Sequence, residues 1–190
     1  MAKMRMFLRE SSVGREPLAV AMSSVRLGER VVQIGVNDAR VVRAIGEKVG
    51  LTGLSTIVVP NESAAARVRS ALGEGLTVAD IRIVPLDHLP FDQAVYDAVI
   101  VHNAEGLMTA LEPAVRDRTV QEWLRVLRPG GRVIVLDPGS PTGLRALLGA
   151  RGSHGSHDTL HTLQASGFTA VRVLGDRQGY RFIEGLKSSR

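Results

Sequence analysis

Short apolar runs alternate along this chain with longer stretches of helical periodicity, and this alternation constrains the fold more than any other feature. Five runs rich in valine and isoleucine occupy residues 30–35, 55–59, 80–84, 97–101 and 132–136. Strands that are apolar at nearly every position are usually covered by helices on both faces. The pattern therefore predicts βαβ units arranged around a largely parallel sheet.

The stretches between these runs predict helices with ordinary start and stop signals. In residues 38–49, for example, valine and isoleucine recur at helical spacing, and the run ends at Gly50. Asn61 is a candidate N-cap, and Pro113 is a candidate break within a longer helix. The predicted helices span residues 17–27, 38–49, 62–72, 110–127, 140–151 and 158–165.

Two further apolar runs, residues 168–174 and 180–186, are separated by a turn too short to hold a helix. They are expected to pair as an antiparallel hairpin. The predicted fold class is therefore α/β: a Rossmann-like, doubly wound, seven-stranded and mostly parallel sheet with a C-terminal antiparallel hairpin. A single domain is expected over residues 1–190, with an N-terminal helical segment at 1–27 and the core at 28–190.

The composition excludes several classes of protein. The chain has no cysteine, which excludes disulfide scaffolds and thiolate catalysis and favours a reducing, cytoplasmic location. Its start lacks the apolar run of a signal peptide, and no stretch approaches the ~18 apolar residues of a membrane span. The net charge of +5 would suit a polyanion, but the basic residues are scattered and aromatic residues make up 4%. A nucleic-acid partner is therefore disfavoured.

Five stretches of the chain match the motifs of one enzyme family in order and spacing. The most specific is Arg-Val-Leu-Arg-Pro-Gly-Gly at residues 125–131, directly before an apolar strand. The others lie at residues 30–39, 48–53, 89–99 and 163–168. On these motifs the chain resembles the class I S-adenosylmethionine-dependent methyltransferases, and most of all the ubiquinone/menaquinone-biosynthesis C-methyltransferases. The resemblance implies S-adenosylmethionine as the cofactor.

The resemblance places the methionine part of the cofactor at the turn after the first strand, where family members carry an acid and then three spaced glycines. Here Gln33 stands at the position of the acid, and only Gly35 remains of the glycines. Asn37 tolerates a left-handed conformation and could replace the second glycine, whereas Ala39 adds a Cβ at the third. The contacts expected from this turn are those of Gly35, Val36 and Asn37.

The family's ribose and adenine contacts also fall on other residue types in this chain. The ribose-binding carboxylate is replaced by Val59, or by Pro60 if the register shifts by one. Glu62 is the nearest acid, and as an early helix residue it more naturally serves the helix dipole. At the adenine position, the backbone N–H of Leu86 could contact the ring, and Asp87 could compensate for the missing acid.

Histidines are the other candidates for chemistry. His102 follows the fourth apolar run, at the carboxyl edge where open α/β sheets hold their ligands, so it is the candidate base or substrate contact. The alternative is a strand-end histidine bonded to backbone. His154, His157 and His161 have a spacing that could hold a metal, with Asp158 beside them. The favoured alternative is a solvated Gly/Ser/His loop, so no metal is predicted.

Three cofactor-binding carboxylates are thus missing together. Each would make charge-assisted hydrogen bonds of ~1.5–3 kcal/mol, so the residues predict a weak or absent cofactor site. Two functions stay open. One is a methyltransferase with a small-molecule acceptor. The other is a non-catalytic methyltransferase-fold protein that has lost S-adenosylmethionine binding and acts as a binding or partner module. The partner is then a small molecule or a protein, and a homodimer is left open.

Overall fold

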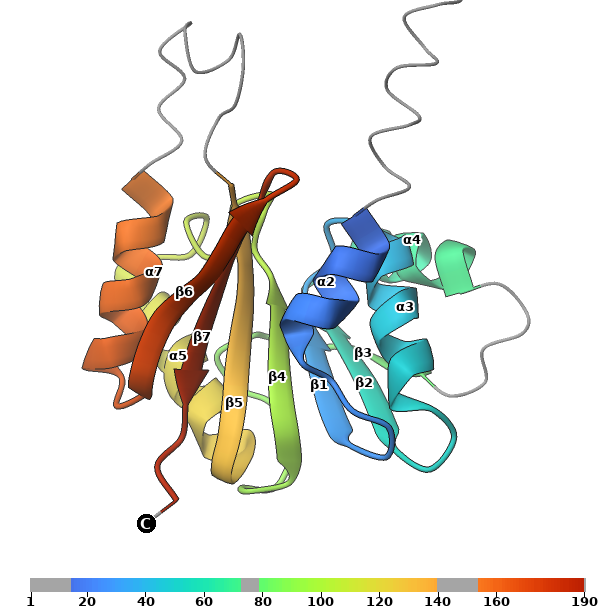
Figure 1. The fold of residues 1–190 in the computed structure, drawn as a ribbon, viewed down its shortest axis with the longest axis horizontal. Coiled ribbons are helices and arrows are strands. Elements are labelled where there is room, and N and C mark those ends of the chain that lie inside the picture. The colour runs from blue at the N-terminus through green and yellow to red at the C-terminus, as the bar shows by residue number, and fades with distance from the viewer. Residues whose placement is uncertain (1–14, 73–78, 140–153, 190) are drawn as a thin grey trace, which may run out of the picture.

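The computed structural model describes residues 15–72, 79–139 and 154–189, and these contain one seven-stranded sheet. The strand order is β3-β2-β1-β4-β5-β7-β6 (Figure 1). Neighbouring strands are parallel from β3 to β5, and the last two strands are antiparallel. The predicted fold class is therefore confirmed. The strands are β1 (Arg30–Ile34), β2 (Leu54–Val59), β3 (Ala79–Ile83), β4 (Tyr96–His102), β5 (Leu127–Pro138), β6 (Thr169–Arg177) and β7 (Tyr180–Leu186).

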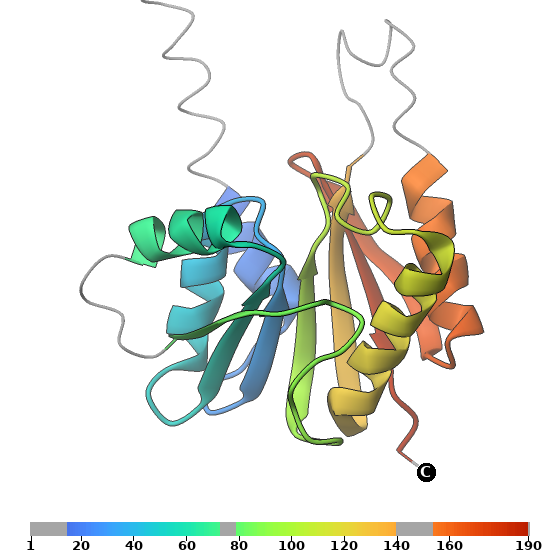
Figure 2. The same cartoon turned by 180° about the vertical axis from the view of Figure 1, so that it is seen from behind.

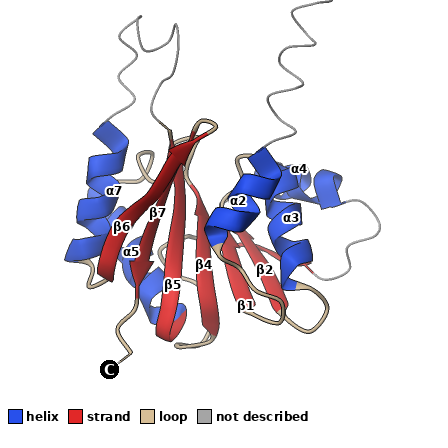
Figure 3. Cartoon of the chain, viewed as in Figure 1, coloured by secondary structure: helices blue, strands red, loops and turns tan. Residues whose placement is uncertain are grey.

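Helices cover both faces of this sheet (Figure 2, Figure 3). The described helices are α2 (Arg15–Ser23), α3 (Ala39–Val49), α4 (Glu62–Leu72), α5 (Pro113–Val126) and α7 (His154–Ala165). One apolar cluster joins Ala19 of α2 and Ile45 of α3 to Ile100 of β4. Another joins Trp123 of α5 and Leu163 of α7 to the opposite face. None of these helices is long and apolar enough to cross a membrane.

Gly50 and Asn61 end and begin their helices as the sequence predicts, and Asp38, which was expected as a helix residue, is the N-cap of α3. The side chain of Asp38 accepts from the backbone N–H of Arg40 at the start of α3, and Gly50 ends that helix with a φ of +70°. At the start of α4, Asn61 accepts from the N–H of Ala64 at 2.9 Å. The predicted N-cap at Asn61 is therefore confirmed.

Two helices are shorter than the sequence predicts. The first was expected over residues 17–27, but α2 ends at Ser23, whose hydroxyl donates to the carbonyl of Val20 at 2.7 Å. Ser24 then adopts a left-handed φ of +52°, which turns the chain away from the helix. The helix expected over 110–127 begins instead at Pro113, because proline suits the first helical position, where no N–H partner is lost.

Two elements in the last third of the chain begin well before their expected starts. β5 runs over Leu127–Pro138 rather than 132–136, and it takes in the Pro-Gly-Gly segment. The reason is pairing with the chain end, since the N–H of Lys187 donates to the carbonyl of Gly131 at 2.8 Å. α7 begins at His154, four residues before the expected start. The helix expected over 140–151 lies outside the described residues.

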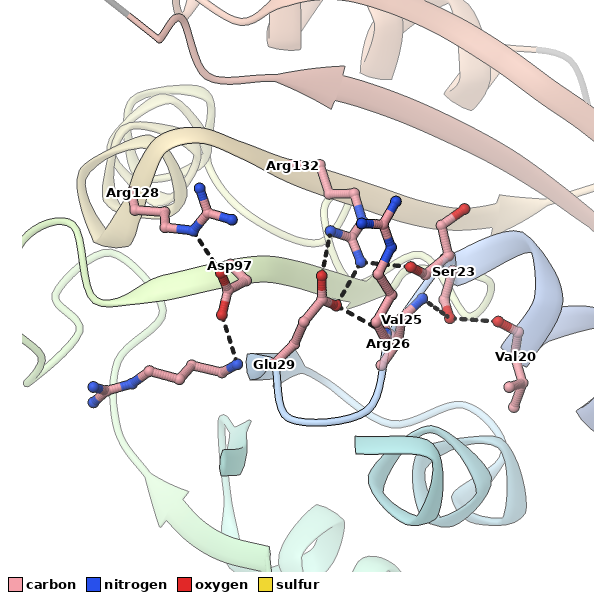
Figure 4. Close-up of polar contacts among 10 residues, drawn as sticks. Val20, Ser23, Val25, Arg26, Glu29, Asp97, Arg128 and Arg132 are labelled. Atoms are coloured by element: carbon pink, nitrogen blue, oxygen red, sulfur yellow. Dashed lines mark hydrogen bonds and ion pairs between the residues drawn. The ribbon is translucent and has the colours of Figure 1, made fainter. Parts of the chain in front are cut away.

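Ion pairs tie the amino ends of three strands together (Figure 4). Arg132 of β5 donates to both carboxylate oxygens of Glu29, at 3.1 and 2.7 Å, and these side chains are only 14% and 13% exposed. Asp97 of β4 accepts from the N–H of Arg30 at 2.8 Å and from Arg128 at 2.5 Å. Burial raises the pKa of Glu29, but the hydrogen bonds from Arg132 and from the backbone outweigh it, so its pKa lies below the ordinary value.

Replacing Arg132 with methionine should lower the free energy of unfolding by about 2–3 kcal/mol, because Glu29 would keep a partly buried charge without its partner. Urea unfolding measures this loss. The matched control is Arg128→Met, since the Arg128 side chain is 51% exposed and such pairs contribute under about 1 kcal/mol. Equal losses in the two variants would contradict this account.

The contribution of this pair should also vanish in acid. Because the pKa of Glu29 is lowered on folding, the unfolded chain takes up the proton first as the pH falls. The stability difference between the wild type and Arg132→Met is therefore fully present above the ordinary pKa of glutamate. It should shrink as the pH falls through the folded-state pKa.

Candidate functional site

The turn after β1 lies at the carboxyl edge of the sheet, where open α/β sheets bind ligands. Gly35 has a φ of +76°, and its N–H donates to the carbonyl of Val58 at 2.8 Å. A Cβ added to Gly35 would lie 2.8 Å from Cδ2 of Leu107 and 3.2 Å from the carbonyl oxygen of His102. The space that this glycine leaves open is therefore taken by the segment after β4.

Asn37 links the same turn to the segment after β4 by hydrogen bonds. With its amide oriented to satisfy both neighbours, Asn37 donates to the carbonyl of His102 at 3.0 Å and accepts from the N–H of Ala104 at 2.7 Å. The preceding residue, Val36, is buried in the apolar cluster that includes Val59 and the inner face of α4. Gly35, Asn37 and His102 are thus brought together, whereas the Val36 side chain faces the core.

Gln33 and His102 form a buried hydrogen bond between β1 and β4. Both side chains are at most 1% exposed, and Nε2 of His102 lies 3.1 Å from Oε1 of Gln33. The Gln33 amide nitrogen donates to the carbonyl of Val42 at 3.0 Å, so its oxygen faces the imidazole and Nε2 carries the proton. Burial lowers the pKa of His102 to about 4, against the opposing effect of the Asp38 carboxylate.

His102 is therefore a neutral, inward-facing ring in this structure. The sequence alone predicted a base or substrate contact, and that role stays a prediction, because it requires the ring to reach a ligand. The backbone-bonded alternative also differs from what is found, since the partner of the imidazole is a side chain. The hydrogen bond to Gln33 was not foreseen from the sequence.

The other residues expected near the cofactor are either buried, exposed or held in ion pairs. Val59 is fully buried, and Pro60 is exposed. Glu62 forms an ion pair with Arg69 along α4. The remaining two, Leu86 and Asp87, lie in the loop after β3: Leu86 packs into the core, and Asp87 pairs with Arg118 at 3.0 Å.

A second polar cluster lies at the ends of β4 and β5. Asn103 donates to Oδ1 of Asp137 at 2.5 Å and accepts from the N–H of Met108 at 2.7 Å. Burial raises the pKa of Asp137, which is fully buried. Sequence reasoning missed Asp137, although its place at the end of an apolar run was a usable signal. A cavity of about 10 Å³, the size of one water, lies beside Asn103 and Trp123.

A larger hollow of about 690 Å³ lies between α2 and α3. Neither this hollow nor the cavity beside Asn103 is lined by residues 35–39, Val59 or Pro60. In the described part of the chain no three histidine, aspartate or glutamate side chains are grouped to hold a metal. His161 is exposed on α7, and the side chains of His154 and His157 lie outside the description, so the predicted absence of a histidine metal site is not tested.

The residues at the carboxyl edge do not fit S-adenosylmethionine. From the resemblance, the cofactor is expected to meet an acid at the position of Gln33, a carboxylate near the end of β2, and open space over the turn glycine. Here the amide of Gln33 is bonded inside the protein, Val59 is buried, and Leu107 lies against Gly35. We therefore derive no catalytic step through this cofactor.

The contact of Leu107 with Gly35 predicts a large effect of a small substitution. Gly35→Ala should destabilise the protein by about 1–3 kcal/mol more than Gly130→Ala, measured by urea unfolding. Gly130 is the matched control because its φ of +75° is the same, while an added Cβ would meet only the end of Arg128 at 3.9 Å. Leu107→Ala in the Gly35→Ala background should recover part of the loss. Equal effects at the two glycines would mean that the space is open.

The buried imidazole predicts a pH dependence of stability. Folding lowers the pKa of His102 to about 4, so the unfolded chain binds a proton first as the pH is lowered. The free energy of unfolding should therefore decrease as the pH falls from the ordinary pKa of histidine to about pH 4. His102→Gln should lack this slope, whereas His88→Gln, at an exposed residue, should keep it. The ring resonances of His102 should also titrate near pH 4 in an NMR series, and titration near the ordinary value would contradict the buried placement.

The comparison with known proteins identifies the family, and the matched segment includes Gln33, Gly35 and His102. The family model "Methyltransferase domain" matches residues 32–135. The ubiquinone/menaquinone biosynthesis C-methyltransferase UbiE of Ralstonia pickettii is 30% identical over 118 residues, which cover 62% of this chain and 46% of that protein. The match thus spans about half the length of the curated relatives.

Solved structures share the fold at low identity. A SAM-dependent methyltransferase from Aquifex aeolicus superposes with a TM-score of 0.71 at 15% identity, covering 90% of this chain and 89% of that one. A complex of the Haloferax volcanii Trm112 methyltransferase activator with a methyltransferase gives 0.68 at 16% identity, covering 92% and 88%. Because the family model covers more than half of the sequence, this chain belongs to the methyltransferase-domain family, of the class I, UbiE-like type.

Proposed function

We propose that this chain is a non-catalytic member of the methyltransferase family that acts as a binding module for a protein partner. The observation that carries the proposal is the close packing at Gly35, where the Leu107 side chain fills the space beside the glycine. Asn37 supports it, because its amide links the β1 turn to the segment after β4.

The chemistry of the edge supports the same conclusion. An amide at Gln33 cannot neutralise an ammonium group, and its oxygen already accepts from His102. With the ribose and adenine acids also absent, several charge-assisted hydrogen bonds of ~1.5–3 kcal/mol are lost. A micromolar affinity for the cofactor would thereby fall to roughly millimolar.

A protein partner is compatible with this fold. The Haloferax volcanii relative is a methyltransferase in complex with a protein activator, so a domain of this architecture can form a protein complex. In this chain the ion pairs at the amino edge of the sheet do not involve residues of the carboxyl edge. The fold can therefore be kept by a protein that has lost the cofactor.

The second candidate function is methyl transfer from S-adenosylmethionine to a small-molecule acceptor. One observation favours it: Gly35 stands at the position of the family's first glycine with a φ of +76°, and the atom nearest to an added Cβ belongs to a side chain, that of Leu107. In that case the acceptor is a small molecule, as in the quinone-directed relatives.

Calorimetric titration with S-adenosylhomocysteine separates the two functions. For the wild type we expect neither saturable heat nor a thermal shift even at millimolar ligand, where a weak site should still be visible. The variant Leu107→Ala should behave in the same way, because the acids are missing as well. Leu111→Ala is the matched control, since that leucine packs on the same cluster.

Either of two results would overturn the proposal. Micromolar binding to the wild type would support the methyltransferase instead. Binding that appears only in Leu107→Ala would mean that the chemistry of the site is intact and that this side chain gates it.

A further inference from the structure

The two edges of the sheet differ in their fitness for pairing with another strand. β6 is irregular: its register with β7 shifts between Thr169 and Arg172 and again between Val173 and Gly175, and Ala170 has a φ of +50°. Bulges of this kind protect an edge from pairing. β3, at the other edge, pairs with β2 over all five of its residues without interruption (Figure 1). β3 is therefore the regular edge.

The hydrogen bonds of β3 show which backbone groups face outward. The N–H of Val84 donates to Val59 of β2, and in a regular ladder alternate residues turn the same way. Asp80 and Arg82 therefore direct their backbone groups toward β2. Ala79, Ile81 and Ile83 direct theirs to the side of β3 on which the described part of the chain places no neighbouring strand.

Charged and apolar side chains alternate along β3. Asp80 and Arg82 lie on one face, 45% and 54% exposed, and form an ion pair at 2.7 Å. Ile81 lies on the other face and packs partly against the α4 cluster. Ile83 lies on that face too and is 42% exposed.

We propose that β3 is a dimer interface, on which β3 of a second copy pairs antiparallel about a twofold axis at Ile81. Ala79, Ile81 and Ile83 would exchange backbone hydrogen bonds with Ile83, Ile81 and Ala79 of the partner subunit. Asp80 would lie opposite Arg82 of the partner subunit, and Arg82 opposite the partner's Asp80. These are the non-hydrogen-bonded pairs, in which facing side chains come closest. The two sheets would join into one.

The charge pattern selects this register over its neighbours. If the partner strand shifts by two residues, the outward backbone groups still face each other, and the twofold axis then lies at Asp80 or at Arg82. Each shifted register places two like charges directly opposite, which is destabilising. Only the axis at Ile81 pairs opposite charges on both sides, so the edge is complementary to itself as an isologous dimer requires.

In this interface the protein partner of the proposed function is a second copy of the chain. The functional role of the dimer rests on the proposed function, whereas the strand pairing itself does not depend on whether the cofactor binds. A five-residue strand buries little surface, so the dimer should be weak and form in the micromolar range. Each copy exchanges its internal Asp80–Arg82 ion pair for an equivalent pair across the axis, so no charge is left alone.

Charge exchange at Asp80 and Arg82 tests the proposal by sedimentation velocity over a range of micromolar concentrations. The wild type should pass from monomer to dimer as concentration rises. Asp80→Arg and Arg82→Asp should each stay monomeric, since like charges would then face each other. An equimolar mixture of these two variants should dimerise again, because one chain carries two positive charges and the other two negative charges at the interface. The double variant, with the charges exchanged, should also dimerise.

Variants of a surface pair on α3 are the matched controls. Arg43 and Glu47 form an exposed ion pair at 2.7 Å, so Glu47→Arg and Arg43→Asp change the net charge equally without touching β3. Both should dimerise like the wild type, and thermal unfolding of each variant checks that it is folded.

Three results would overturn the interface: a wild type that is monomeric throughout, single variants that still dimerise, or a mixture that does not. The titration with S-adenosylhomocysteine is a separate outcome. Micromolar binding with the charge-dependent dimer intact would remove the non-catalytic function and leave the interface standing.

Discussion

The buried hydrogen bond between Gln33 and His102 is the interaction on which the carboxyl edge of this protein depends. It joins β1 to β4, the two strands at which the order of the sheet reverses, and open α/β sheets bind their ligands beside that point. The Gln33 amide is satisfied from inside, by Val42 on one side and the imidazole on the other. Leu107 and Asn37 then close the turn above it. The polar groups of Gln33, Asn37 and His102 are thus bonded to one another or to the backbone.

The opposite edge of the sheet has polar contacts of its own. There Glu29 and Asp97 are held by arginines and by backbone N–H groups, which join the start of β1 to β4 and β5. These contacts lie a full strand length from the closed crevice, and each face of the sheet has its own apolar cluster. The ion pairs at the amino edge thus stabilise the sheet through residues other than those of the β1 turn.

The sequence analysis was most accurate where an element depends on local interactions, and less accurate where it depends on contacts that leave no local pattern. The helix over Glu62–Leu72 and its cap at Asn61 were predicted to the residue, because periodicity and capping are local. The end of α2 at Ser23 was missed, since a serine hydroxyl bonding back to Val20 leaves no periodic signal. The true length of β5 depends on its pairing with the chain near Lys187, which lies far away in sequence.

The sequence by itself determined the fold class and the loss of the carboxylates that family members use, because both follow from residue types read in order. It did not determine where the remaining polar groups point. Gln33 and His102 are 69 positions apart, and Gly35 meets Leu107 only because β1 and β4 are neighbours in the sheet. The same holds for β3, whose alternating charges become an exposed edge only through the strand order. Contacts between distant residues are set by the tertiary arrangement, which alone decides whether a retained motif is an open site or a closed one.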